Sequence, residues 1–243
     1  MKIQYFSDLH LECFKKQIFP SIMNQWIQVR APILALCGDI GNPSEPLYKS
    51  FLQHVSSRFE KIFIICGNHE YYHHTIPETE QQIRSLCTRF PNISFLQNSF
   101  EDYHGYRFAG TTLWSHISNP TYLTNDFTRI QGFSITTCNQ LHQESKNFVQ
   151  QIMDSSPIPV IMLSHHVPST LVIDPIYDQF RKTYQQCYSS SSEDLIRPPI
   201  HTWIYGHTHR PYVGMINGVH MHCNPIGYPG ENKDICFHRI IEW

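Results

Sequence analysis

The stretch "KIFIICGNHE" (residues 61–70) joins a strand-like apolar run to a glycine, an asparagine, a histidine and a glutamate. A second apolar run, "PILALC" (residues 32–37), also ends in glycine, here followed by an acid, in "CGDIG" (residues 37–41). Neither run has a polar face, which is typical of strands that are covered on both sides. The two stretches therefore predict a sheet that delivers polar side chains to its carboxyl edge.

The chain around these runs continues the α/β pattern. Residues 46–59 have a helical pattern between the two apolar runs, so the three segments form a βαβ unit. The Asn-Gly pair at 217–218 lies between alternating segments and predicts a tight hairpin. Further strands are predicted at residues 2–7, 93–97, 106–114, 158–163 and 201–205, and further helices at residues 78–90 and 139–154.

Composition and charge exclude several classes of protein. With 243 residues, 41% hydrophobic and 16% charged, the chain predicts one globular domain over residues 1–243. Its formal charge of -2 gives no long-range field that would attract nucleic acid or an anionic membrane. The N-terminus enters a strand-like pattern without an apolar signal segment, and no later run is long enough to cross a bilayer. We therefore expect a cytoplasmic protein.

A polar segment at about residues 169–199 interrupts the strand pattern. It is longer than the usual connection in a compact domain, which favours a lid or a binding loop. A mobile surface loop is the open alternative. We expect this segment to be an insertion in the predicted domain.

The eight cysteines include no CxxC pair. Cys37 and Cys66 lie inside apolar runs, where a thiol behaves as a small hydrophobic group. The sequence thus predicts reduced cysteines, and the absence of thiolate pairs argues against a structural zinc site.

Polar, metal-competent side chains follow five of the apolar runs. They are Asp8 and His10 in "SDLHLE", Asp39 in "CGDIG", Asn68 and His69 in "CGNHE", His165 and His166 in "SHHVP", and His207 and His209 in "GHTHRP". The carboxyl ends of parallel strands meet at one edge of a sheet, where ligands characteristically bind. Each cluster alone is a weak signal, but together they predict one shared site.

This ordered set resembles the calcineurin-like metallophosphoesterase family, whose pattern is DxH, GDxG or GDxxD, GNHE or GNHD, a later His, and GHxH. The resemblance implies an α/β fold, a two-sheet β-sandwich flanked by helices, with a dinuclear metal centre at the strand ends. Carried over by position, one metal would be held by Asp8, His10 and His209, the other by Asn68, His165 and His207, and Asp39 would bridge both.

Carboxylate and carbonyl oxygens with imidazole nitrogens suit Mn²⁺, Fe or Zn²⁺, and the residues do not choose among these metals. The resemblance implies hydrolysis of a phosphomonoester or a phosphodiester by a bridging hydroxide, without a phosphoenzyme. Two divalent ions would also supply the positive charge that the surface lacks. The expected partner is thus a phosphoester substrate, and the sequence names neither the substrate nor a protein partner.

The predicted catalytic residues are Asp39 and His69. His69 would act as the general acid for the leaving alkoxide, and a histidine that only orients Glu70 or a ligand is the alternative. One branch of the family has an aspartate three residues after the bridging aspartate to orient this histidine. The corresponding residue here is Asn42, so we expect the pKa of His69 to be less raised.

Several neighbours have open roles. Glu70 is predicted to be a structural hydrogen-bonding partner rather than a base. Residues 71–74 are predicted to form a packed aromatic loop, with a place at the rim of the pocket as the alternative. His166 and Arg210 are candidate contacts for the substrate phosphate, with structural use as the alternative for each.

Two rival functions follow from the same residues. A non-catalytic scaffold could keep the fold to bind a protein partner, but it would be expected to lose metal ligands. A nuclease would need a basic groove or interleaved aromatic and basic residues. All seven proposed ligands and His69 are present, which favours the enzyme.

Overall fold

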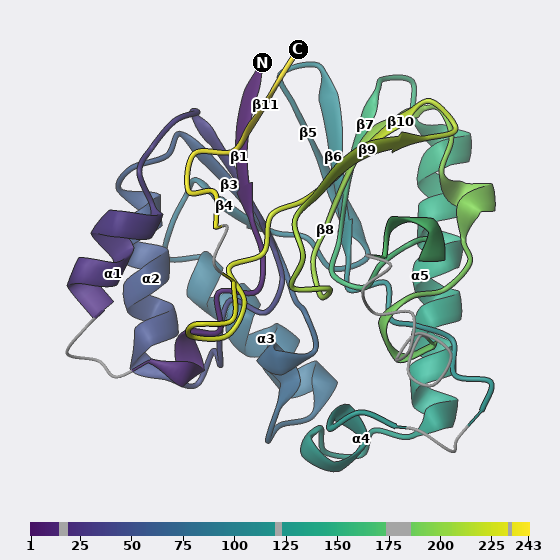
Figure 1. Cartoon of the computed structure of the whole chain (residues 1–243), viewed down its shortest axis with the longest axis horizontal. Helices are drawn as coiled ribbons and strands as arrows, with labels where there is room; N and C mark the ends of the chain where they lie inside the picture. Colours follow the sequence, from purple (N-terminus) through teal and green to yellow (C-terminus); the bar gives the residue numbers. More distant parts are fainter. Residues whose placement is uncertain (15–18, 120–122, 174–185, 233–234) are drawn as a thin grey trace.

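Two mixed β-sheets pack face to face, and helices cover both outer faces (Figure 1). This arrangement comes from a computed structural model that describes residues 1–14, 19–119, 123–173, 186–232 and 235–243. Helices α1 and α2 lie against the first sheet, and α5 lies against the second (Figure 1). The predicted two-sheet sandwich flanked by helices is confirmed.

The first sheet has the strand order β11-β1-β2-β3-β4. Strands β1 to β4 are parallel to their neighbours, whereas β11 pairs antiparallel with β1. The five strands are β1 (Lys2–Phe6), β2 (Ile33–Cys37), β3 (Lys61–Ile65), β4 (Ile93–Phe95) and β11 (Ile240–Glu242). The sequence did not predict β11, since it is only three residues long.

The second sheet has the strand order β5-β6-β7-β8-β10-β9. Its four central strands are parallel, and both edge strands are antiparallel to their neighbours. The strands are β5 (Ser99–Tyr103), β6 (Tyr106–Thr111), β7 (Val160–Ser164), β8 (Ile200–Tyr205), β9 (Tyr212–Ile216) and β10 (Val219–Cys223). Asn217 and Gly218 both have positive φ in the turn between β9 and β10, which confirms the predicted hairpin.

Helices α3 and α5 begin where the sequence supplies a capping residue. Thr75 and Glu78 form a reciprocal capping box at the start of α3, and the Ser134 side chain caps α5. The α-helices are α1 (Phe19–Trp26), α2 (Pro46–Ser56), α3 (Ile76–Cys87), α4 (Asp126–Arg129) and α5 (Ile135–Ser155). Short 3₁₀ turns are η1 (Leu11–Cys13), η3 (His69–Tyr71), η4 (Thr170–Val172) and η6 (Glu193–Leu195).

The central strands are buried on both faces, as their lack of a polar face predicts. In β3, Phe63 faces the second sheet and stacks on Phe108 with ring centroids 4.0 Å apart. Ile64, one residue further, packs on the opposite face with Phe51 of α2. Each such side chain contributes about 1.5–3 kcal/mol when buried. Cys37 and Cys66 are buried thiols that form no disulfide, in agreement with the sequence.

The predicted polar insertion is described only in part. Residues 174–185 of the segment 169–199 lie outside the described residues. The described parts contain η4 and η6, and Ser189 forms an isolated bridge with Val167 after β7. These parts therefore lie next to the carboxyl end of a central strand.

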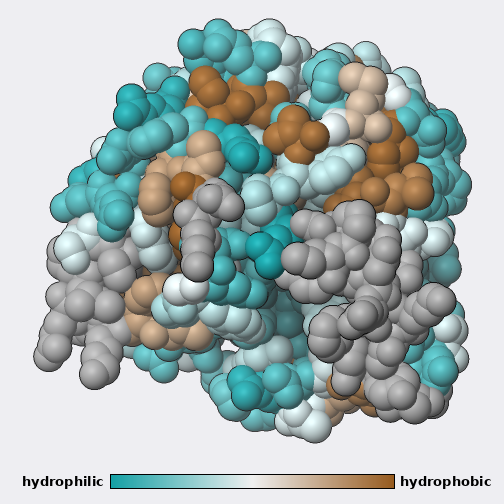
Figure 2. Space-filling model, in the orientation of Figure 1, coloured by the Kyte–Doolittle hydropathy of each residue, from teal (hydrophilic) through white to brown (hydrophobic). Residues whose placement is uncertain are grey.

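The visible surface is mainly hydrophilic at the lower centre of Figure 2, the side toward which the central strands run in Figure 1. Apolar surface shows in patches higher up in this view, and one of them lies at the upper right, over the region of β9 and β10 (Figure 2). Val213 and Met215 of β9 are both exposed. Among the helices that the structure describes, none is long and apolar enough to cross a membrane.

Candidate metal centre

The predicted ligands come together at the carboxyl ends of five parallel strands. Asp8 and His10 follow β1, Asp39 follows β2, Asn68 follows β3, His165 follows β7, and His207 and His209 follow β8. All but His209 are buried. Residues from both sheets thus share one site between the sheets.

The backbone at the strand ends is unusual. The left-handed conformation occurs at Asp8 (φ 55°), His10 (φ 47°), Asp39 (φ 52°), His207 (φ 71°) and His209 (φ 50°). Asp, Asn and His adopt this region more readily than most other residues, because their polar side chains can hydrogen-bond locally. These sharp turns let adjacent loops pair, with the Asp8 N–H donating to the Gly38 carbonyl at 3.0 Å.

The glycine in the stretch "CGNHE" has a steric reason. A Cβ atom at Gly67 would lie 2.1 Å from Asp39 Oδ1 and 2.7 Å from His165 Cε1. Only glycine lets the β3 loop approach these side chains so closely.

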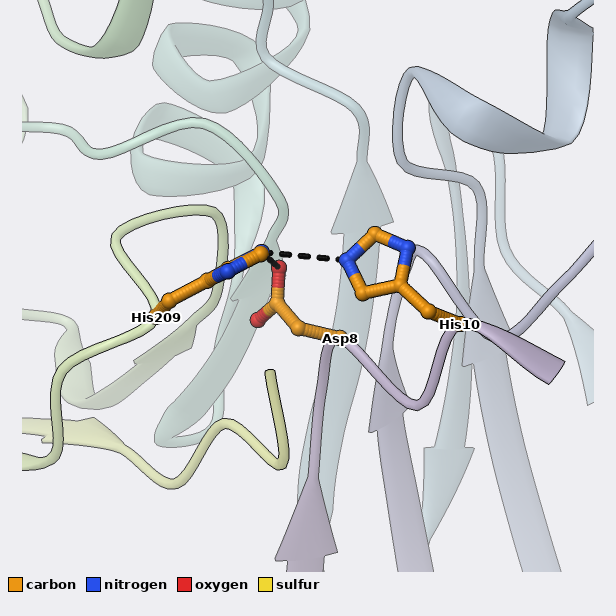
Figure 3. Close-up of side chains that lie close together, drawn as sticks. All are labelled: Asp8, His10 and His209. Carbon is orange, nitrogen blue, oxygen red and sulfur yellow. Dashed lines mark hydrogen bonds and ion pairs between the residues drawn. The ribbon is translucent and has the colours of Figure 1, made fainter. Parts of the chain in front are cut away.

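The first cluster contains Asp8, His10 and His209 (Figure 3). The two Nε2 atoms of His10 and His209 face each other at 3.0 Å, and Asp8 Oδ1 is 3.4 Å from His209 Nε2. The outer nitrogens contact carboxylates, with His10 Nδ1 3.0 Å from Glu12 and His209 Nδ1 2.7 Å from Glu231. Since an ionised carboxylate only accepts hydrogen bonds, each Nδ1 carries a proton, which leaves Nε2 as the nitrogen that can present a lone pair to a cation.

Two lone pairs at this distance repel unless a cation or a proton lies between them. An inward carboxylate and two inward imidazole nitrogens are also the donors that Mn²⁺, Fe and Zn²⁺ accept. The first cluster therefore fits a metal ion.

The second cluster contains Asp39, His165 and His207. His165 Nε2 is 3.1 Å from His207 Nδ1 and 3.1 Å from Asn68 Oδ1. Its outer nitrogen donates to the Cys37 carbonyl at 2.8 Å, so Nε2 is again the nitrogen that can present a lone pair to a cation. The Asn68 amide donates to Asp126 at 2.8 Å, which turns the carbonyl oxygen of Asn68 toward the cluster. This donor set also fits a metal ion.

Asp39 lies between the two clusters. Its Oδ1 is 3.4 Å from His165 Nε2, and its Oδ2 is 3.8 Å from His10 Nε2. One oxygen of the same carboxylate thus faces each cluster, which is the arrangement that a shared ligand requires.

The charges of the side chains in the two clusters compensate one another. Burial alone would lower the pKa of His165, but the Asp39 carboxylate outweighs it and raises this pKa to about 9. Burial also opposes protonation of His209, whereas hydrogen bonds to Asp8 and Glu231 raise its pKa to about 10. Burial and the neighbouring His165 lower the pKa of His207 to about 4. Protons therefore occupy positions in which cations would replace them.

His69 lies beside the first cluster. Its Nδ1 is 2.9 Å from Glu12, and its Nε2 is 3.9 Å from Asp39 Oδ2 and 3.2 Å from the Tyr228 hydroxyl. The Glu12 contact holds the imidazole so that Nε2 faces Asp39.

Whether Asn42 leaves the pKa of His69 less raised than an aspartate would stays a prediction, but this pKa is raised without a carboxylate at position 42. Burial would lower this pKa, but the Asp39 charge and the hydrogen bond to Glu12 raise it. Asn42 instead accepts a hydrogen bond from the Ser44 backbone at 2.9 Å. Glu12 thus supplies the carboxylate that the sequence pattern lacks at position 42.

Glu70 contacts only the backbone of the neighbouring loops in the part of the chain that the structure describes. It accepts hydrogen bonds from the N–H groups of Asp39 at 3.0 Å, Ile40 at 2.7 Å and Gly67 at 2.7 Å. These bonds join the loops after β2 and β3, as the prediction of a structural partner requires.

The remaining predicted neighbours lie at the margin. His166 is buried, stacks on His207 with centroids 4.3 Å apart, and contacts the Ser115 hydroxyl at 2.8 Å. Tyr72 packs beside His69, while Arg210 is half-buried directly after His209. Contact of His166 or Arg210 with a substrate phosphate stays a prediction.

Sequence reasoning missed four residues of the site. They are Glu12, Asp126, Tyr228 and Glu231. Glu12 could have been found, since it lies two residues after His10 in "SDLHLE". Asp126 begins the short helix α4, and Tyr228 and Glu231 lie in the loop after β10. None of these three follows a recognisable sequence pattern, and only the fold brings them to the site.

Comparison with known proteins agrees with this geometry. The calcineurin-like phosphoesterase family model matches residues 1–211. The chain belongs to the calcineurin-like phosphoesterase family. The matched residues include both clusters, whereas Tyr228 and Glu231 lie beyond them.

One relative is similar to the chain in sequence, and two solved structures are similar to it in fold. An uncharacterised protein of Acanthamoeba polyphaga mimivirus is 30% identical over 99% of this chain and 96% of its own length. A phosphopantetheinyl hydrolase from Mycobacterium tuberculosis has a TM-score of 0.69 at 14% identity, over 94% of this chain and 90% of that one. A dimetal phosphatase from Danio rerio has a TM-score of 0.52 at 14% identity, over 92% and 86%. At these identities the two structures show the shared fold alone.

Proposed function

We propose that this member of the calcineurin-like phosphoesterase family is a hydrolase that cleaves a phosphomonoester or a phosphodiester with a dinuclear metal centre. The observation that carries the proposal is Asp39, whose two oxygens face two separate clusters of inward-facing donors. His69, a group able to give a proton, lies on the same side of Asp39.

The proposed ligands divide as the two clusters do. Asp8, His10 and His209 would hold one ion, Asn68, His165 and His207 would hold the other, and Asp39 would contact both. When bound, two divalent ions of Mn, Fe or Zn neutralise the phosphoester charge and lower the pKa of a coordinated water toward about 7. Asn68 adds no further negative charge where an anionic substrate must bind.

His69 is the proposed general acid for the leaving oxygen. Its Nδ1–H stays on Glu12, so Nε2 is the nitrogen that gives the proton to the departing oxygen. The raised pKa of His69 favours the protonated form that a general acid needs.

Two rival proposals have less support. A scaffold that binds only a protein partner has no need of opposed imidazole lone pairs backed by carboxylates. A nuclease needs basic surface, and the chain has 18 basic and 20 acidic residues. The cytoplasmic location and the single domain with an insertion at 169–199 stay proposals from the sequence.

The direct test is hydrolysis by the Mn²⁺-loaded protein. Aryl phosphomonoester, aryl phosphodiester and nucleotide substrates would each be assayed before and after a chelator. We expect at least one ester to be cleaved, with the activity lost in chelator and restored by metal. A protein that binds two metals per chain and cleaves none of these esters would contradict the proposal.

Metal binding is expected to release protons. At pH 7 the raised pKa values of His165 and His209 keep both rings protonated without metal, and a ligand histidine must be neutral. Rising pH removes these competing protons, so the affinity for metal should increase between pH 6 and 8. Calorimetric titration with Mn²⁺ in buffers of different ionisation enthalpy measures the protons released. An affinity that is constant over this range would contradict the assignment of these two histidines.

A further inference from the structure

The loop that follows β10 is joined to the strand end that carries Asp8. The Ile226 N–H donates to the Ser7 carbonyl at 3.0 Å, and the Gly227 N–H donates to the Asp8 carbonyl at 2.8 Å. Asn232 donates to the carbonyls of Pro225 and Ile226, which closes the loop on itself. This loop lies beyond the residues that match the family. The fold therefore attaches to the first cluster a segment that the shared pattern does not include.

Glu231 links this loop to a proposed ligand. Its Oε2 lies 2.7 Å from His209 Nδ1 and accepts from the Tyr228 N–H at 2.9 Å. The Glu231 N–H donates back to the Tyr228 carbonyl at 2.9 Å. These reciprocal bonds form a turn that holds the carboxylate against the outer nitrogen of His209.

The same turn places Tyr228 over the cluster. The Tyr228 ring stacks on His10 with centroids 4.3 Å apart, and its hydroxyl is 3.2 Å from His69 Nε2. Glu231 therefore holds one histidine of the cluster, while its neighbour in the turn covers the other.

We propose that Glu231 is a positioning residue for the metal ion that Asp8, His10 and His209 would hold. Its carboxylate fixes the tautomer and the orientation of His209, so that Nε2 faces Asp8 and His10. It also makes that imidazole a stronger donor to a cation. The inference rests on the proposed metal centre, but it does not depend on ester hydrolysis.

The effect should be confined to one of the two metal positions. In the second cluster, the outer nitrogen of His165 donates to the Cys37 carbonyl, and Asp126 orients Asn68. Glu231 contacts neither residue among the hydrogen bonds and ion pairs that the structure describes. Loss of the Glu231 carboxylate should therefore weaken metal binding at the first cluster and leave binding at the second cluster unchanged.

The experiment is titration of the metal-free full chain with Mn²⁺, followed by calorimetry and by the electron paramagnetic resonance signal of free Mn²⁺. We expect Glu231→Ala to weaken the affinity of one binding step about 10- to 100-fold, the usual effect of losing a carboxylate that hydrogen-bonds a metal-binding histidine. The affinity of the other step should stay within about twofold. Glu231→Gln keeps an oxygen that accepts from Nδ1 but removes the charge, so its loss should be smaller.

One variant serves as the matched control. Glu144→Ala removes an exposed carboxylate on α5, away from both clusters. It should bind Mn²⁺ within about twofold of the unchanged chain.

Two results would overturn the inference: unchanged affinity in a folded Glu231→Ala variant, or an equal loss at both steps. Circular dichroism and thermal unfolding establish that each variant is folded. A chain that binds two ions and cleaves no ester would refute the proposed function alone, because this titration measures affinity only.

Discussion

Asp39→Asn is expected to lose tight binding of one or both metals and to lower kcat/KM by at least about a hundredfold. In the unchanged protein, Asp39 Oδ1 accepts a hydrogen bond from the backbone N–H of His69 at 2.9 Å. Asparagine keeps an oxygen that can accept this bond but removes the negative charge between the two clusters. Stabilisation by a metal centre is worth several kcal/mol in the transition state, and each 1.36 kcal/mol is a factor of ten in rate. Metal content by mass spectrometry and hydrolysis of an aryl phosphoester provide the two measurements.

A matched control for this variant is Asp102→Asn. Asp102 is an exposed carboxylate that pairs with Arg107 in the β5–β6 hairpin, far in the fold from the strand ends. It should retain both metals and normal activity. Two tightly bound metals per chain in Asp39→Asn would refute the role of Asp39 as the shared ligand.

His69→Asn is expected to slow an alkyl phosphate far more than a p-nitrophenyl phosphate of the same charge. General acid catalysis contributes about 10²- to 10⁴-fold, and it matters most when the departing oxygen is strongly basic. p-Nitrophenolate leaves without needing a proton, so the two substrates should separate by at least roughly tenfold. The variant should retain both metals, since His69 is not among the proposed ligands. Steady-state kinetics on the metal-saturated protein measures the difference.

His74→Asn provides the comparison, because His74 lies in the same loop and contacts the Ser44 hydroxyl rather than the clusters. It should leave both rates nearly unchanged. If His69→Asn slows the two substrates by the same factor, His69 acts on the phosphoryl group or the metal shell, and another group protonates the leaving oxygen.

Much of the fold followed from local pattern. Strands β2, β3 and β7 are continuous apolar runs that end in polar residues, and such runs are buried in the sheet whatever surrounds them. The short elements α1, α4, β5 and β11 were not predicted. The β5 sequence Ser-Phe-Glu-Asp-Tyr has two adjacent acids and gives only a weak alternation. Its pairing with β6, rather than its own pattern, makes it a strand.

The residues of the candidate site also fall into those that the sequence predicts and those that it does not. Residues at strand ends could be located, because a parallel sheet fixes where its carboxyl ends lie. The orientation of His69 could not be predicted, since it depends on Glu12, 57 positions earlier in the chain. The contact of Glu231 with His209 likewise depends on how the loop after β10 folds back. Local chemistry therefore predicts the proposed ligands, whereas tertiary packing selects the groups that orient them.

The left-handed backbone at the proposed ligands has an evolutionary consequence. Five of them, Asp8, His10, Asp39, His207 and His209, occupy a conformation that costs a residue with a side chain on the order of 1 kcal/mol. Glycine would relieve that strain at any of these positions, but it would remove a metal donor. The two carboxylates also have a use in the fold, since Asp8 accepts the His207 N–H at 3.0 Å and Asp39 accepts the His69 N–H at 2.9 Å. The three histidines have no comparable backbone contact among the described hydrogen bonds, so selection for the proposed metal chemistry is the main force that would retain them. In a descendant freed from that selection, we expect glycine to replace these histidines before it replaces Asp8 or Asp39, and such a pattern would mark the loss of the proposed metals.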